Sequence, residues 1–214
     1  MFRVQVLLFL TCLAAAAEPL VGEAGLAELS AARAAVRVVS GSGVMTVVRA
    51  DEPDEPGMTW NARFAAATDG RYDVVLSDAG DPAGARERYL CVADEVVEVV
   101  QLSIEDAPQI KRRRASDDLF ATLMACVRLD PAVLQKDYAI TLAAGEAGQR
   151  VLRLIPTRAE ILREVASINV ILDASGRPKQ LAVLESSGNL RRLVLGDFTD
   201  DPQLEPGWFV PPPR

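Results

Sequence analysis

Histidine is absent from this chain, and its absence excludes much of enzyme chemistry. Histidine is the commonest general base and the commonest side-chain ligand of transition metals. Without it, serine–histidine and cysteine–histidine catalysis are excluded. Cysteine is scarce too, with three residues and no CxxC pair, and neither a GxGxxG nor a Walker-type loop is present. We therefore expect no enzymatic activity, no metal and no cofactor.

Carboxylates are the catalytic groups that this composition leaves. They cluster in three predicted turns, at Asp51–Glu55, at Asp94 and Glu95, and at Asp200 and Asp201. Solvated loops explain such clusters better than acid–base catalysis does. The net charge of −7 also repels phosphate backbones, so we expect no nucleic-acid partner.

The first residues have the composition of a secretory signal peptide. Arg3 precedes the apolar stretch Val4–Leu13, and the alanines that end at Ala17 fit a cleavage site. About ten apolar residues are too few to cross a bilayer, and no later run is longer. We predict that residues 1–17 direct export and that residues 18–214 form a single soluble domain. A short N-terminal core helix is the alternative.

Two cysteines, Cys91 and Cys126, lie in the predicted mature domain. In an oxidising compartment such a pair forms a disulfide, which would contribute about 3–4 kcal/mol in the chain-entropy model. Both side chains fit equally well as small buried apolar groups. The sequence leaves these two alternatives open.

Most of the chain alternates β-branched or apolar runs with turn residues, a pattern that predicts an antiparallel sheet of about ten strands. Ser40–Gly43 predicts a bend or bulge in the first of them. Several strands are apolar on both faces, so one face must be covered by helices or by curling of the sheet. The predicted fold is mainly β with helices (α+β), a curved antiparallel sheet. The expected strands are 36–50, 59–67, 71–77, a pair within 88–101, 138–143, 149–156, 167–173, 179–185 and 190–198.

Ser116–Leu129 is the clearest predicted helix, because Ser116 fits an N-cap and Arg128 lies in the last turn. Its apolar side chains recur at helical spacing and form one stripe. This stripe is either ordinary core packing or a lid over an apolar cavity. The stripe consists of Leu119, Phe120, Leu123, Met124 and Val127. Shorter helical signals lie at Glu23–Ala35 and Arg158–Ala166, and a short turn runs from Pro131 to Leu134.

A basic run, Lys111, Arg112, Arg113 and Arg114, lies in a segment, 103–115, that we predict to be a loop. A solvated loop that balances the acidic turns is one interpretation. The other is a docking site for an acidic partner or for lipid headgroups.

The order of these features resembles the LolA family of periplasmic lipoprotein carriers. The similarity is greatest from Leu152–Pro156 (LRLIP) through the helical AEILREVA to Ile168–Asp173, with Gly176 and Pro178 in the next turn. The chain then closes with Gly207–Pro212 (GWFVPP), which is similar to the F-x-x-P-P ending of the family. The resemblance implies a periplasmic protein with an incomplete β-barrel covered by helices.

It also implies a monomeric carrier that receives acylated lipoproteins from an inner-membrane transporter. The acyl chains would lie between the concave face of the sheet and the helical stripe, against Ile168, Val170 and Leu172. The alternative on the same scaffold is an envelope sensor or interaction module that docks at the basic run. One family feature is missing, because no arginine–proline pair that would latch the lid precedes the second strand pair; the stretch reads Ala66–Gly70.

The resemblance sets a condition on the empty carrier. Burying a methylene group contributes about 0.8 kcal/mol, so several full acyl chains would bind almost irreversibly. The walls of the cavity must therefore fill partly with their own side chains when no ligand is bound.

Overall fold

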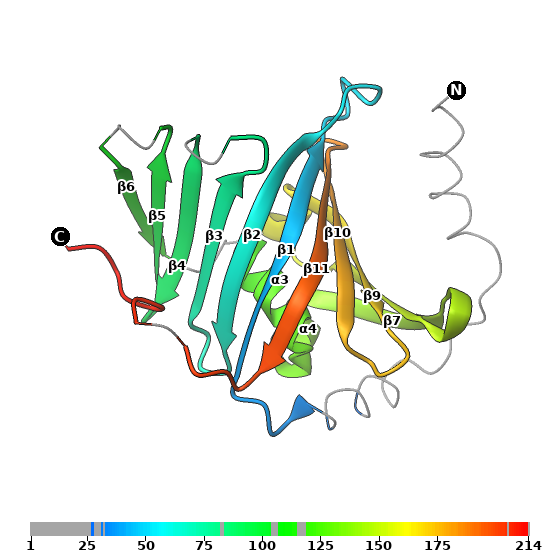
Figure 1. Ribbon diagram of the computed structural model, residues 1–214. Helices are drawn as coiled ribbons and strands as arrows, with labels where there is room; N and C mark the ends of the chain where they lie inside the picture. Colours follow the sequence, from blue (N-terminus) through cyan, green and yellow to red (C-terminus); the bar gives the residue numbers. More distant parts are fainter. Residues whose placement is uncertain are drawn as a thin grey trace.

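The structure, a computed structural model, describes residues 27, 31, 33–81, 84–103, 107–114, 119–204 and 206–213. Within them the chain forms one antiparallel sheet of 11 strands in the order β6-β5-β4-β3-β2-β1-β11-β10-β9-β8-β7, which is curved but not closed (Figure 1). The predicted fold class is confirmed. The strands are β1 (Val38–Val48), β2 (Met58–Ala67), β3 (Tyr72–Asp78), β4 (Arg86–Val92), β5 (Glu95–Gln101), β6 (Gln109–Arg114), β7 (Tyr138–Ala144), β8 (Arg150–Pro156), β9 (Val165–Leu172), β10 (Pro178–Glu185) and β11 (Leu190–Asp200).

Two meanders, β1 to β6 and β7 to β11, meet in the middle of the sheet where β1 pairs with β11. The register of this pair shifts between Gly41 and Gly43, which confirms the bulge predicted there. Any side chain at either glycine would collide with the backbone of β11. Glycine therefore lets the two meanders approach closely at the centre of the sheet.

The helices are α3 (Leu119–Arg128), α4 (Pro131–Asp137) and the single turn α5 (Ala159–Leu162), with a 3₁₀ turn, η2, at Glu146–Gly148. Figure 1 shows the sheet curling around α3 and α4, which lie on its concave side. Asp130 caps α4, since its Oδ1 accepts a hydrogen bond from the backbone N–H of Val133 at 3.3 Å.

One apolar core fills the space between the concave face and α3 and α4. Strand alternation builds it, because every second side chain points to the same face. The register sets Leu152 and Leu181 on either side of Val170, and all three are fully or almost fully buried.

Three sequence predictions need correction. The segment that carries the basic run is not a loop, since Gln109–Arg114 forms the edge strand β6. The turn after Pro131 continues as α4 to Asp137. The helix expected at Arg158–Ala166 is only α5, which buries no residue, because Val165 already belongs to β9.

The predicted signal peptide and eight of the 13 residues of the helix predicted at Glu23–Ala35 lie outside the described residues. Among the residues that the structure describes, no helix is long and apolar enough to cross a membrane. The division into residues 1–17 and 18–214 stays a prediction.

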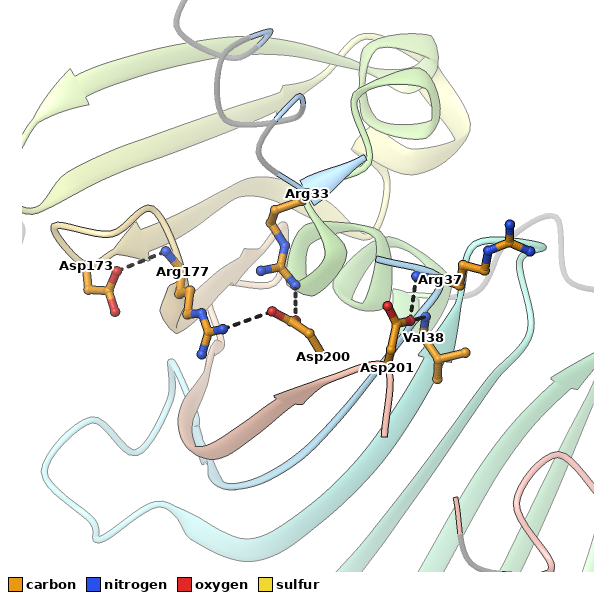
Figure 2. A network of polar contacts seen from close by, with 7 residues as sticks. All are labelled: Arg33, Arg37, Val38, Asp173, Arg177, Asp200 and Asp201. Carbon is orange, nitrogen blue, oxygen red and sulfur yellow. Dashed lines mark hydrogen bonds and ion pairs between the residues drawn. The ribbon is translucent and has the colours of Figure 1, made fainter. Parts of the chain in front are cut away.

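The acidic pair at the end of β11 is structural and is not simply solvated as we expected (Figure 2). The Asp200 carboxylate accepts from the Arg33 guanidinium at 2.8 Å and from the Arg177 guanidinium at 2.9 Å. Oδ1 of Asp201 accepts from the backbone N–H groups of Arg37 and Val38, at 2.7 and 2.9 Å. These contacts fasten the segment before β1 and the β9–β10 turn to β11.

Candidate functional site

The candidate site is the concave face of the sheet together with the helix that covers it. Seven of the eight predicted cavity residues are buried in one core, and Leu119 packs against it. From α3 these are Phe120, Leu123, Met124 and Val127, and from β9 they are Ile168, Val170 and Leu172. The three β9 side chains have no exposed surface. The structure thus brings the predicted residues together, and in this state their own side chains fill the space between them.

Two hollows lie at opposite ends of β2. The smaller, of about 90 Å³, lies between α3, α4 and the β2–β3 turn. The larger, of about 500 Å³, lies where β1 and β2 reach the loop that joins them. Its lining residues are Val47, Arg49, Ala50, Asp51, Met58, Ser187, Asn189 and Arg191.

At the larger hollow a core residue lies beside an exposed apolar side chain. Val47 belongs to the core and is 8% exposed, whereas its register partner Met58 is 57% exposed. A polar rim surrounds them. Arg49 is paired with Asp51 at 2.7 Å, and Arg191 is paired with Glu185. An apolar floor with a paired, charged rim suits a ligand that has an apolar part and a polar end.

Arg128 fastens one end of α3 to the sheet. Its Nη1 donates to the carbonyl of Ala67 at the end of β2, and its Nη2 donates to Asp130 at 3.1 Å. The side chain is 9% exposed and its Nε has no hydrogen-bond partner in the described part of the chain. Burial lowers the pKa of Arg128. Sequence analysis gave this arginine only a role at the helix end, and no pattern in the sequence marks its reach to β2.

An aromatic contact holds the other end of α3. The rings of Phe120 and Tyr89 lie with their centroids 4.3 Å apart. The Tyr89 hydroxyl donates to Glu87 at 2.6 Å. Burial, followed by this hydrogen bond, raises the pKa of Tyr89.

No disulfide ties α3 to the sheet in this structure. Neither Cys91 on β4 nor Cys126 on α3 forms a disulfide, and both side chains are buried. Burial raises the pKa of the Cys126 thiol to about 12. The disulfide alternative is therefore not realised here, and both cysteines act as small apolar core residues.

The GWFVPP ending lies on the convex face, away from the candidate cavity. Asp73, which is 1% exposed, pairs with Arg88 at 2.5 Å and also accepts from the backbone N–H of Phe209 at 3.1 Å. Arg88 donates in turn to the carbonyl of Gly207 at 2.9 Å. The guanidinium of Arg63 lies over the ring of Trp208. This tail clamp was missed from the sequence, although an aspartate inside the apolar strand Tyr72–Asp78 was a signal for it.

The predicted docking residues Lys111, Arg112, Arg113 and Arg114 lie on the outermost strand of the β1–β6 meander, at the far edge of the sheet from β7. Arg112 pairs with Glu95 at 2.9 Å and donates to the carbonyl of Pro212 at 3.0 Å. The structure does not bring this run together with the residues of α3 and β9.

No family model and no curated protein matches the chain. Three solved structures are similar to it over most of their lengths. A DUF1329 family protein from Desulfovibrio piger has a TM-score of 0.48 at 10% identity, covering 90% of this chain and 98% of that one. A putative outer membrane lipoprotein-sorting protein domain from Vibrio parahaemolyticus has a TM-score of 0.45 at 14% identity, covering 85% of this chain and 93% of that one. A LolA superfamily protein from Nitrosomonas europaea has a TM-score of 0.44 at 12% identity, covering 84% of this chain and 93% of that one.

Proposed function

We propose that this protein is an exported, non-enzymatic carrier that takes the acyl chains of lipoproteins or lipids between its concave face and α3. The observation that supports the proposal best is the way the core is closed. Within the described residues, α3 and α4 cover a wide apolar face without a disulfide between α3 and the sheet, and the core residue Val47 lies beside the exposed side chain of Met58.

The energetics of this closure suit a carrier. The four large buried side chains of α3 are Phe120, Leu123, Met124 and Val127. Exposing them would cost about 6–12 kcal/mol at roughly 1.5–3 kcal/mol each. A chain of about 16 carbons gains about 12 kcal/mol when buried, at roughly 0.8 kcal/mol per methylene. The two terms are of similar size, so a ligand that displaces α3 is bound reversibly and can be handed on.

The setting of the proposal is the periplasm. The carrier would act as a soluble monomer that receives its cargo from an inner-membrane transporter and releases it toward the outer membrane. The closed core of the structure is then the empty state. Entry of a chain requires α3 to leave the sheet, which breaks the contacts of Arg128 with Ala67 and of Phe120 with Tyr89.

A substitution at the mouth of the core tests the proposal without disturbing its packing. Met58→Glu places a charge beside the expected path of the chain, at a side chain that is already 57% exposed. We expect binding of a fluorescent C16 acyl probe to weaken at least tenfold. The matched control is Val194→Glu, because Val194 is 46% exposed and its neighbours Leu193 and Leu195 are the residues of β11 that enter the core.

The control should bind the probe within twofold of the wild type. Circular dichroism and thermal melting establish that both variants are folded. Absence of probe binding by the wild type, or equal weakening in both variants, would remove the support for an acyl site at this mouth.

A further inference from the structure

The two free edges of the sheet differ sharply in charge. A strand at the edge of a sheet presents unpaired backbone N–H and C=O groups that another chain can pair with. One edge strand here is β6 and the other is β7. The first carries four consecutive basic residues, whereas β7 carries no charged residue at all. Basic side chains are thus not a general protection of the edges of this sheet.

Two of the four charges face solvent without a partner. Lys111 and Arg114 are exposed, and neither forms an ion pair with any residue that the structure describes. By contrast, Arg112 is occupied by Glu95 and by the C-terminal tail. In a chain of net charge −7, β5 and β6 together carry four basic residues against the carboxylates of Glu95 and Glu98, so this edge keeps an excess of positive charge.

An apolar side chain lies among the charges. Ile110 is 42% exposed and is the register partner of Val99 on β5. The register pairs Lys111 with Glu98, so the basic side chain of Lys111 and the apolar side chain of Ile110 point to opposite faces. A partner strand would meet Lys111 on one face, and both Ile110 and Arg114 on the other.

We propose that β6 is a docking strand for an acidic, extended segment of a partner protein, which adds to the sheet as a further strand. Backbone pairing along β6 supplies affinity, and the charges of Lys111 and Arg114 select glutamate- or aspartate-rich segments over neutral ones. This surface lies at the edge of the sheet and is independent of acyl binding under α3.

The probe for this site is a labelled ten-residue peptide in which pairs of glutamates alternate with pairs of valines, so that glutamates lie on both faces of an added strand, with binding followed by fluorescence anisotropy. We expect saturable binding that weakens as salt is added. Lys111→Glu with Arg114→Glu should reduce affinity at least tenfold. The control, Arg153→Glu with Arg163→Glu, makes the same change of charge at exposed positions on β8 and beside α5 and should bind within twofold of the wild type.

Two further probes separate strand addition from charge attraction alone. In two peptide analogues the backbone is N-methylated at odd or at even residues, which blocks pairing along one side without changing charge. Loss of binding in at least one analogue supports the proposal, and full binding of both overturns it. Binding of phosphatidylglycerol vesicles without peptide binding would make β6 a lipid-facing edge, and binding of neither would make it a solvated edge; both results overturn the proposal.

Discussion

Under the proposed carrier function, replacing Arg128 by methionine should make the protein bind acyl chains more tightly. The methionine fills similar space but cannot donate to Ala67, so the closed position of α3 loses one charge-assisted hydrogen bond. Such a bond contributes about 1.5–3 kcal/mol. A ligand that binds only when α3 has left the sheet must also supply the free energy of opening. A lower free energy of opening therefore lowers the apparent Kd by the corresponding factor. We expect the apparent Kd for a C16 acyl probe to fall by about 10- to 100-fold.

The assay combines probe titration with hydrogen exchange of α3. Exchange of the α3 amides should accelerate in Arg128→Met, while exchange in β8, whose backbone is paired with β7 and β9, should not change. Arg153→Met, at an exposed position on β8, serves as a control for the loss of one arginine. Unchanged affinity together with faster exchange in α3 would refute the reasoning, because the helix would then open without admitting a ligand.

Two further predictions concern buried ionisable groups. The pKa of Cys126 is raised from 9.0 to about 12 in the folded state, so the contribution of its thiol to the free energy of unfolding is complete below pH 9 and is lost as the pH rises toward 12. Denaturant titrations at increasing pH should show this decline in stability. In Cys126→Ala the part of the decline between pH 9 and 10 should be absent. Asp73→Asn leaves Arg88 without its carboxylate and should destabilise the fold by about 3 kcal/mol, the low end for a broken buried pair because Arg88 is partly exposed. Limited proteolysis should then cut the tail near Trp208 sooner, whereas Asp51→Asn, which breaks an exposed pair, should leave the tail protected.

Local patterns predicted most of the sheet because each hairpin has its own turn signal. Asp69-Gly70 gave the β2–β3 turn and Gly176 the β9–β10 turn, and both glycines have positive φ. The strand β6 was missed because four successive charges hide the alternation that identifies a strand. Such a sequence can form a strand because β6 is at the edge of the sheet, where charged side chains on both faces reach solvent.

The sequence predicted which side chains of α3 and β9 lie together in the core, and their role as an acyl site stays a prediction. The spacing of Leu123, Met124 and Val127 identifies the face of α3 that is buried, and Ile168 and Val170 identify the face of β9. The same periodicity is expected whether such faces touch each other or enclose a ligand. Only packing distinguishes the two, and packing is a property of the whole fold. The contact of Arg128 with Ala67 could not be predicted for the same reason, because 61 residues separate them in sequence and only the packed fold brings them together.

The β2–β3 turn connects the two faces of the sheet. On the concave side the carbonyl of Ala67 accepts from Arg128 of α3. Four residues later the guanidinium of Arg71 lies 4.9 Å from the ring centre of Phe209 in the tail. The backbone N–H of Ala67 also donates to the carbonyl of Arg71 at 2.8 Å. The C-terminal tail and α3 therefore both contact the same short turn, one from each face of the sheet.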